Sequence, residues 1–271
     1  MDVATVDYWA TSGRSYLHRA SPVAKIVAAA AGIATVVVVQ NVLVLAAVYL
    51  LVLAAARRAR IPLRPFVLAT TYSAVFALLL AVAQYAGDWV IPLTTVVKAM
   101  TAAAVVVLLI ATTPYPQLFA PLRRLLPGIV VDVLYVTYRS VFIVLGVLTD
   151  LLTAVRLRGG FVGRNIGSRA RNLAAAFGLG AIHALDVSER TYAVMRVRGY
   201  SGGLSGERSS GLRGRDAPLL MAALSVAAVA FVFRFQWRAL NPYSWLPALI
   251  ALVVLGLCLA LPRRSGEEAR P

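Results

Sequence analysis

The sequence has few charged residues and a single cysteine. Of its 271 residues only 14% are charged, whereas 60% are hydrophobic. The mean hydropathy of +0.79 lies far above that of a soluble domain of this size. Cys258 has no second cysteine in the chain with which to form a disulfide or a metal cluster. This composition excludes an ordinary water-soluble protein and predicts an all-α, polytopic membrane protein.

Residues on which many enzymes depend are also scarce. Lys25 and Lys98 are the two lysines, and neither follows the glycine spacing of a phosphate-binding loop. His18 and His183 lie far apart, with no carboxylate or cysteine near either at the spacing of metal ligands. We therefore expect no catalysis, no ATP hydrolysis by the chain itself and no bound metal or cofactor.

Apolar runs predict about six membrane spans, because roughly 20 apolar residues cross a bilayer. Four spans lie in an N-terminal membrane part, residues 1–113, and two in a C-terminal part, residues 218–262, before a tail at 263–271. Between these parts, residues 114–217 contain frequent arginine, and apolar residues recur there at helical spacing. This pattern indicates amphipathic helices on the cytoplasmic side.

The basic residues predict the orientation, since short loops rich in Lys and Arg stay in the cytoplasm. With both termini inside, all 27 Lys and Arg except Lys98, Arg234 and Arg238 fall on the inner side. The net charge of +16 then reflects topology, and we expect no nucleic-acid partner. We expect Lys98 to lie near the outer interface and to extend toward Asp88.

One short pattern occurs twice, as Arg156-Leu157-Arg158-Gly159 and again as Arg196-Val197-Arg198-Gly199. Glycine in the left-handed conformation often closes a helix, and arginine in the last turn complements the negative end of the helix dipole. The pattern therefore predicts two capped helix ends. They are either solvated basic ends or paired arginines that bind acidic pockets of a partner through bidentate bonds. The candidate docking residues are Arg156, Arg158, Gly159, Arg196, Arg198 and Gly199.

A second candidate surface is a stripe of small and apolar residues on one predicted helix. It consists of Leu173, Phe177, Ala181, Ala184 and Tyr192. Such a stripe allows close contact with another membrane helix. Alternatively, it packs the amphipathic helices together or lies at the membrane interface.

Longer segments resemble the transmembrane (T) component of energy-coupling factor transporters, the EcfT/CbiQ family, and especially its cobalt/nickel members. The similarity begins in the segment 15–25, which ends in Pro22-Val-Ala-Lys25, and it continues at Ala111-Thr-Thr-Pro114, Leu125-Leu-Pro127 and Thr137-Tyr-Arg139. It is strongest in the segment 188–200, Ser-Glu-Arg-Thr-Tyr-Ala-Val-Met-Arg-Val-Arg-Gly-Tyr, and covers the chain up to about residue 205. The family usually has alanine where this chain has Leu157 and Val197.

The resemblance implies a complex with two ABC ATPase subunits and a separate solute-binding membrane (S) subunit in a prokaryotic cell membrane. The arginine–glycine helix ends would dock into grooves of the ATPases, and the stripe of residues 173–192 would contact the solute-binding subunit. The implied cargo is cobalt or nickel, with a vitamin as the alternative. This chain would transmit ATP-driven motion between its partners.

Two other functional classes stay open from the residues alone. A membrane-embedded lipid enzyme needs a convergent set of polar or acidic residues at interface depth, and none is evident among the 11 carboxylates. A stand-alone secondary carrier is expected to have duplicated halves or charges within several spans. Lys98 by itself supports neither class.

Overall fold

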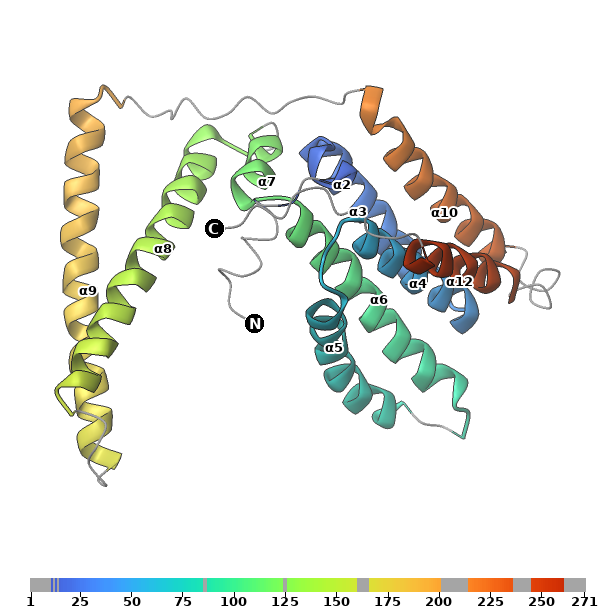
Figure 1. The fold of residues 1–271 in the computed structure, drawn as a ribbon, viewed down its shortest axis with the longest axis horizontal. Coiled ribbons are helices and arrows are strands. Elements are labelled where there is room, and N and C mark those ends of the chain that lie inside the picture. The colour runs from blue at the N-terminus through green and yellow to red at the C-terminus, as the bar shows by residue number, and fades with distance from the viewer. Residues whose placement is uncertain are drawn as a thin grey trace. The chain divides into compact units, whose positions relative to one another are not determined.

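Every regular element that the structure describes is helical. The computed structural model describes residues 11, 13, 15–84, 87–123, 126–159, 166–200, 214–235 and 245–260. The chain divides into two compact units, one formed by residues 1–118 and 209–271 and the other by residues 119–208. The helices of both units are drawn in Figure 1. The all-α prediction is therefore confirmed.

The first unit, the membrane bundle, combines N-terminal and C-terminal helices. Its elements are α2 (Tyr16–Arg19), α3 (Pro22–Val38), α4 (Val42–Arg58), α5 (Leu63–Ala83), α6 (Val90–Thr112), the 3-10 turn η1 (Gly214–Asp216), α10 (Ala217–Phe235) and α12 (Trp245–Ala260). Helix α5 packs on α6, α6 also contacts α3 and α4, α10 packs on α3, and α12 packs on α4. The two predicted membrane parts thus form one bundle.

Local sequence signals explain where the first two long helices begin. Ser21 caps α3 by accepting a hydrogen bond from the backbone N–H of Ala24 at 3.3 Å, and Pro22 occupies the first helical position. Asn41 caps α4 in the same way, since its Oδ1 accepts from the N–H of Leu43 at 2.9 Å. These caps allow two helices to follow each other after a very short connection.

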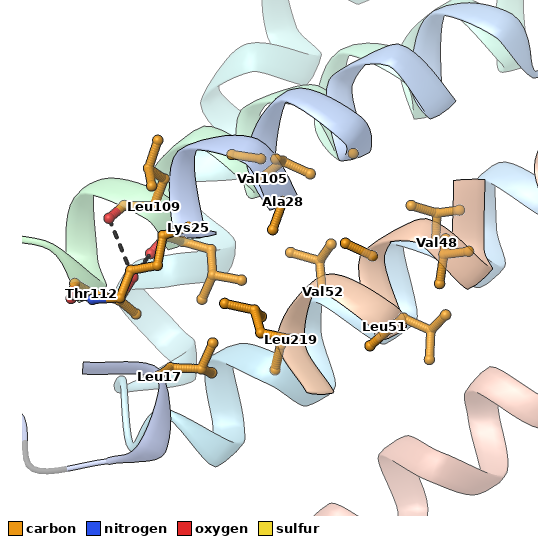
Figure 2. A pocket seen from close by; sticks show the side chains of 17 residues that line it. Leu17, Lys25, Ala28, Val48, Leu51, Val52, Val105, Leu109, Thr112 and Leu219 are labelled. Carbon is orange, nitrogen blue, oxygen red and sulfur yellow. Dashed lines mark hydrogen bonds between the residues drawn. The ribbon is translucent and has the colours of Figure 1, made fainter. Parts of the chain in front are cut away.

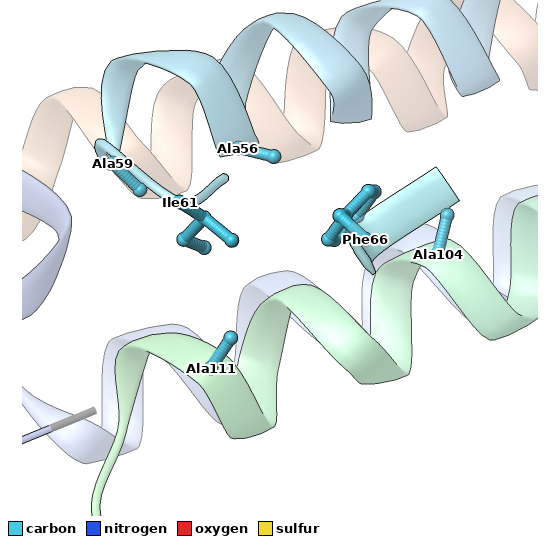
Figure 3. Close-up of a cluster of buried hydrophobic side chains, with 6 residues drawn as sticks. All are labelled: Ala56, Ala59, Ile61, Phe66, Ala104 and Ala111. Carbon is cyan, nitrogen blue, oxygen red and sulfur yellow. The ribbon is translucent and has the colours of Figure 1, made fainter. Parts of the chain in front are cut away.

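A cluster of buried apolar side chains holds α4, α5 and α6 together. Figure 3 shows Phe66 in the space between α4 and α6. The cluster consists of Ala56, Ala59, Ile61, Phe66, Ala104 and Ala111. Alanine at four of these six positions lets the helix backbones approach closely. In lipid the hydrophobic effect does not drive helices together, so they associate through close packing of this kind.

Lys98 contacts a different partner from the one expected. Its Nζ donates a hydrogen bond to the carbonyl of Val37 at 3.4 Å, in the last turn of α3, and the expected extension toward Asp88 is wrong. The free carbonyls at a helix C-terminus carry partial negative charge, so they attract an ammonium group.

The second unit consists of residues 119–208, with the end of α7 (Tyr115–Leu122), α8 (Gly128–Leu157) and α9 (Ile166–Val197). Helices α8 and α9 run side by side in opposite directions (Figure 1). The Leu151 side chain lies so near Gly180 that a Cβ added there would sit 3.6 Å from it. An ion pair of 2.9 Å between Arg123 and Asp132 joins the chain after α7 to the first turns of α8.

By length and composition, four described helical segments could cross a membrane, namely α5, α6, α8 and η1 with α10, while α3 and α12 are shorter apolar helices. Helix α8 belongs to the region 114–217 that the sequence pattern places outside the bilayer. However, Arg139 and Asp150 interrupt it, so its longest uncharged stretch is the ten residues 140–149. That is about half of the apolar length that a bilayer core requires.

Candidate functional site

The first Arg-x-Arg-Gly segment ends α8 as the sequence predicts. Arg158 is the C-cap, and its N–H donates to the carbonyl of Ala154 at 3.1 Å. Gly159 follows with φ of +71° and donates its N–H to the carbonyl of Arg156 at 3.1 Å. The left-handed glycine therefore turns the chain sharply away from the helix axis just after the second arginine.

The second segment ends α9 with the same geometry. Gly199 has φ of +80° and donates to the carbonyl of Arg196 at 3.0 Å. Tyr200 donates to the carbonyl of Met195, also at 3.0 Å, which completes the pair of hydrogen bonds of a Schellman motif. The two predicted capped helix ends are thus confirmed, and we call residues 156–159 the first tip and residues 196–199 the second tip.

Both tips present their side chains to solvent. The arginines of the two tips are exposed in each case. Between the arginines of each tip stands an apolar residue, Leu157 with 83% and Val197 with 89% of its surface exposed. Each tip is therefore an apolar side chain flanked by two guanidinium groups, which matches a groove with an apolar floor and acidic edges.

The tips lie at opposite ends of the pair formed by α8 and α9 (Figure 1). This follows from the antiparallel packing, because each tip is the C-terminal end of its own helix. Helix α9 has 32 residues, so it is about 48 Å long at 1.5 Å per residue.

The stripe on α9 is not uniform in its surroundings. Leu173 and Ala184 are half-buried, and Leu173 lies beside Leu152, Thr153 and Arg156 of α8. Phe177, Ala181 and Tyr192 are exposed, with Phe177 and Tyr192 at 56% and 58%. At 3.6 residues per turn, Leu173 and Ala184 lie within about 20° of each other around the helix, whereas the three exposed residues lie further round, so one edge of the stripe is turned toward α8. The exposed members are the ones open to another protein.

A buried polar cluster in the membrane bundle is the feature that the sequence pattern missed. Lys25 is only 4% exposed, and its Nζ donates to the carbonyls of Thr112 at 2.9 Å and His18 at 3.2 Å. Figure 2 shows Lys25 and Thr112 at one end of an apolar hollow of about 200 Å³. From the sequence, Lys25 was only part of a segment of family resemblance, with no sign of its hydrogen-bond partners.

Most of the chain matches a known protein family. A family model described as CbiQ, cobalt transport protein, matches residues 13–209, which include both tips and Lys25. The chain belongs to this family. A comparison with curated proteins finds no match. As a CbiQ-family protein with several span-capable helices, the chain is a membrane component of a transport system.

Proposed function

We propose that this CbiQ-family chain is the transmembrane coupling subunit of an energy-coupling factor ABC importer. It transmits ATP-driven motion from two separate ATPase subunits to a solute-binding membrane subunit. The observation that carries the proposal is the pair of matched tips at residues 156–159 and 196–199, with the same left-handed glycine and the same exposed arginines. Two equal tips suit two equal ATPase subunits.

The chemistry of the tips supports docking into proteins rather than lipid. A guanidinium group binds a carboxylate through two parallel hydrogen bonds, so it fixes direction as well as distance. A tip that transmits force needs an interaction whose direction is fixed in this way. The exposed Leu157 and Val197 add an apolar contact at the centre of each interface, where most binding energy is found.

The exposed part of the stripe on α9 supplies the second interface in this proposal. Phe177, Ala181 and Tyr192 would contact the solute-binding subunit, together with the half-buried Leu173 and Ala184. In this arrangement α8 and α9 lie on the cytoplasmic side, with both chain termini inside and the apolar surface of α8 against the partner and the membrane interface. The interrupting charges of Arg139 and Asp150 favour this location over a full crossing.

Cargo recognition is assigned to the other membrane subunit. Within the described ranges, no three His, Cys, Asp or Glu side chains lie close enough together to hold a metal ion. The family description makes cobalt the first cargo to test, with nickel next and a vitamin as the alternative. Uptake of each by the assembled complex in a prokaryotic cell membrane distinguishes them.

The decisive experiment is co-purification of the chain with ABC ATPases, for the wild type and for Arg158→Glu/Arg198→Glu. We expect the double charge reversal to abolish both ATPase association and ATP-dependent uptake, because like charges would then face each other at both tips. The matched control is Arg58→Glu/Arg171→Glu, which makes the same charge change at two other exposed arginines. The control is expected to retain association.

The location of the first tip is tested independently. Arg158→Cys in a Cys258→Ser background gives one thiol, which a membrane-impermeant reagent should modify only from the cytoplasmic side. Modification from the outer side would mean that α8 crosses the membrane, and the proposal would fail. Unchanged association of Arg158→Glu/Arg198→Glu would refute docking at the tips.

A further inference from the structure

An apolar hollow runs through the membrane bundle along α4 and α10. Helix α10 packs on α3, and α12 packs on α4. The first part of the hollow, of about 200 Å³, lies among α3, α4, α6 and α10 (Figure 2). The second part, of about 450 Å³, lies among α4, α10 and α12. Val48, Leu51 and Val226 line both parts, so the two adjoin along these helices.

The length of the hollow matches one leaflet of a bilayer. On α10 the lining residues recur at helical spacing from Leu219 to Phe233, a distance of about 21 Å at 1.5 Å per residue. One leaflet of the hydrocarbon core is about 15 Å thick. Apart from Lys25, Thr112 and Ser225, the lining consists of apolar residues and one glycine. Such a space suits a hydrocarbon chain.

The width of the hollow excludes a helix of another protein as its occupant. A helix with its side chains is roughly 10–12 Å across, so a stretch as long as the hollow would fill roughly 1,600 Å³ or more. Each part of the hollow is several times smaller than that. A single acyl chain fits, and it restores the packing contacts that an empty space would forfeit.

Positive charge lines one end of this hollow. Lys25 lies there and is only 4% exposed. An ammonium group has three N–H donors. Among the described residues, the partners of Lys25 are two backbone carbonyls, those of His18 and Thr112. The third N–H is left to attract a negatively charged oxygen.

Two exposed arginines stand at the same end. Arg19 is the last residue of α2, and Leu17 of this helix lines the hollow. The carbonyl of Arg215 accepts a hydrogen bond from the hydroxyl of Tyr16, also in α2. Asp216 is the buried carboxylate next to Arg215, and the three cations outweigh its single charge. The hollow therefore combines an apolar length with a basic end.

We propose that this hollow is a binding site for one anionic phospholipid of the cytoplasmic leaflet. One acyl chain lies along α4 and α10, and the phosphate lies at Arg19 and Arg215, with Lys25 at the start of the chain. The predicted orientation places this end at the cytoplasmic leaflet, where anionic lipids concentrate. The inference goes beyond the coupling function and does not depend on it, since it uses only the membrane bundle.

The test is native mass spectrometry of the full chain, purified in detergent and titrated with lipid. Dioleoyl phosphatidylglycerol and dioleoyl phosphatidylcholine have the same chains and differ in net charge. We expect one phosphatidylglycerol per chain to bind about 20-fold more tightly than phosphatidylcholine, since each basic residue near an anionic lipid contributes about fivefold. Glycerol 3-phosphate, which has the phosphate without the chains, should not compete.

The place of the acyl chain is tested by filling the hollow. Val226→Phe adds a bulky ring where the two parts adjoin. It should weaken phosphatidylglycerol binding by about tenfold or more, because each methylene group kept out of the hollow costs about fourfold in affinity. The matched control is Ala228→Phe, at an exposed position of the same helix that lines neither part. It should leave binding unchanged.

The basic end is tested separately, with replacements of exposed residues that keep the fold even where Val226→Phe does not. Arg19→Gln/Arg215→Gln should abolish most of the preference for phosphatidylglycerol over phosphatidylcholine. The matched control is Arg64→Gln/Arg234→Gln, which removes the same charge from two other exposed arginines. Arg64 is on α5, which lines neither part, and Arg234 is at the opposite end of α10.

Several results would overturn the inference. Equal binding of the two lipids, or competition by glycerol 3-phosphate, would mean that the site does not recognise an anionic phospholipid. Wild-type phosphatidylglycerol binding by folded Val226→Phe would mean that no acyl chain occupies the hollow. If that variant instead lost assembly with another membrane subunit, the occupant would be part of that subunit.

Discussion

Replacing the tip glycines by alanine isolates the contribution of backbone geometry to docking. Gly159 and Gly199 have φ of +71° and +80°. A Cβ added at either position would meet no atom within 4 Å. Steric crowding by neighbours is therefore absent, and the effect of Gly159→Ala or Gly199→Ala comes from the left-handed conformation alone.

The magnitude follows from two opposing terms. An L-residue in the left-handed region is less stable than glycine by about 1–2 kcal/mol. Alanine also has less conformational freedom than glycine in the unfolded chain, which offsets this destabilisation by about 0.4–1 kcal/mol. The net effect is about 1 kcal/mol against the bent tip, so each variant should bind an ATPase about fivefold more weakly. The tips are far apart, so their effects should add, to about 2 kcal/mol and about 30-fold for the double variant.

The assay is the ATPase concentration that gives half-maximal association with the purified chain, together with thermal unfolding of the chain itself. Unfolding should change little, because an exposed helix end frays without unfolding the helix. Gly146→Ala in α8 and Gly178→Ala in α9 are matched controls, since neither glycine has positive φ and an added Cβ again meets nothing. They should stabilise their helices by about 0.5–1 kcal/mol and leave association intact.

A specific result would refute this reasoning. If Gly199→Ala bound ATPases as tightly as the wild type while Gly178→Ala weakened binding, the left-handed turn would have no part in docking. Gly199→Asn offers a further check, because asparagine tolerates the left-handed region better than alanine and should bind more tightly than the alanine variant.

Further predictions concern stability and are all measured by thermal unfolding of the purified chain. Asp132 is buried whereas the Arg123 side chain is 31% exposed. Arg123→Leu withdraws the guanidinium from a buried carboxylate and should destabilise the fold by about 3 kcal/mol, whereas Asp132→Leu leaves a guanidinium that water can reach and should destabilise it by about 1 kcal/mol. Equal losses of stability in the two variants would contradict this asymmetry. The buried hydroxyl of Thr113 has no hydrogen-bond partner among the described residues, so Thr113→Val should be neutral or stabilising by up to about 1 kcal/mol. Thr70→Val, which removes the partner of the Tyr49 hydroxyl at 3.1 Å, should destabilise by about 1–2 kcal/mol, and a larger loss at Thr113 than at Thr70 would overturn the comparison.

The features that the sequence predicted correctly are those with local causes. Apolar runs and the shortage of charge are enough for a helical membrane protein, because backbone groups in lipid must bond within their own segment. The two helix ends were equally predictable. Glycine is the residue that reaches positive φ without penalty, and the arginines before it are drawn to the dipole within a single turn.

Features that depend on distant residues were not predictable in this way. The sequence suggested one continuous stripe on α9, but Leu173 is half-buried beside α8 while Phe177 and Tyr192 are exposed. Which side of a helix is covered depends on where its neighbour packs. In the same way, Lys98 bonds the carbonyl of Val37 because the end of α3 lies beside α6.

The sequence by itself thus determined the class of protein, its helices and the form of the two tips, since each of these results from interactions within a few residues. Only the tertiary structure decided that α10 packs on α3, and with it the hydrogen bond from the backbone N–H of Ser21 to Asp216. These residues are almost 200 positions apart. Their meeting is a consequence of helix packing, because α10 lies against α3 only in the folded bundle.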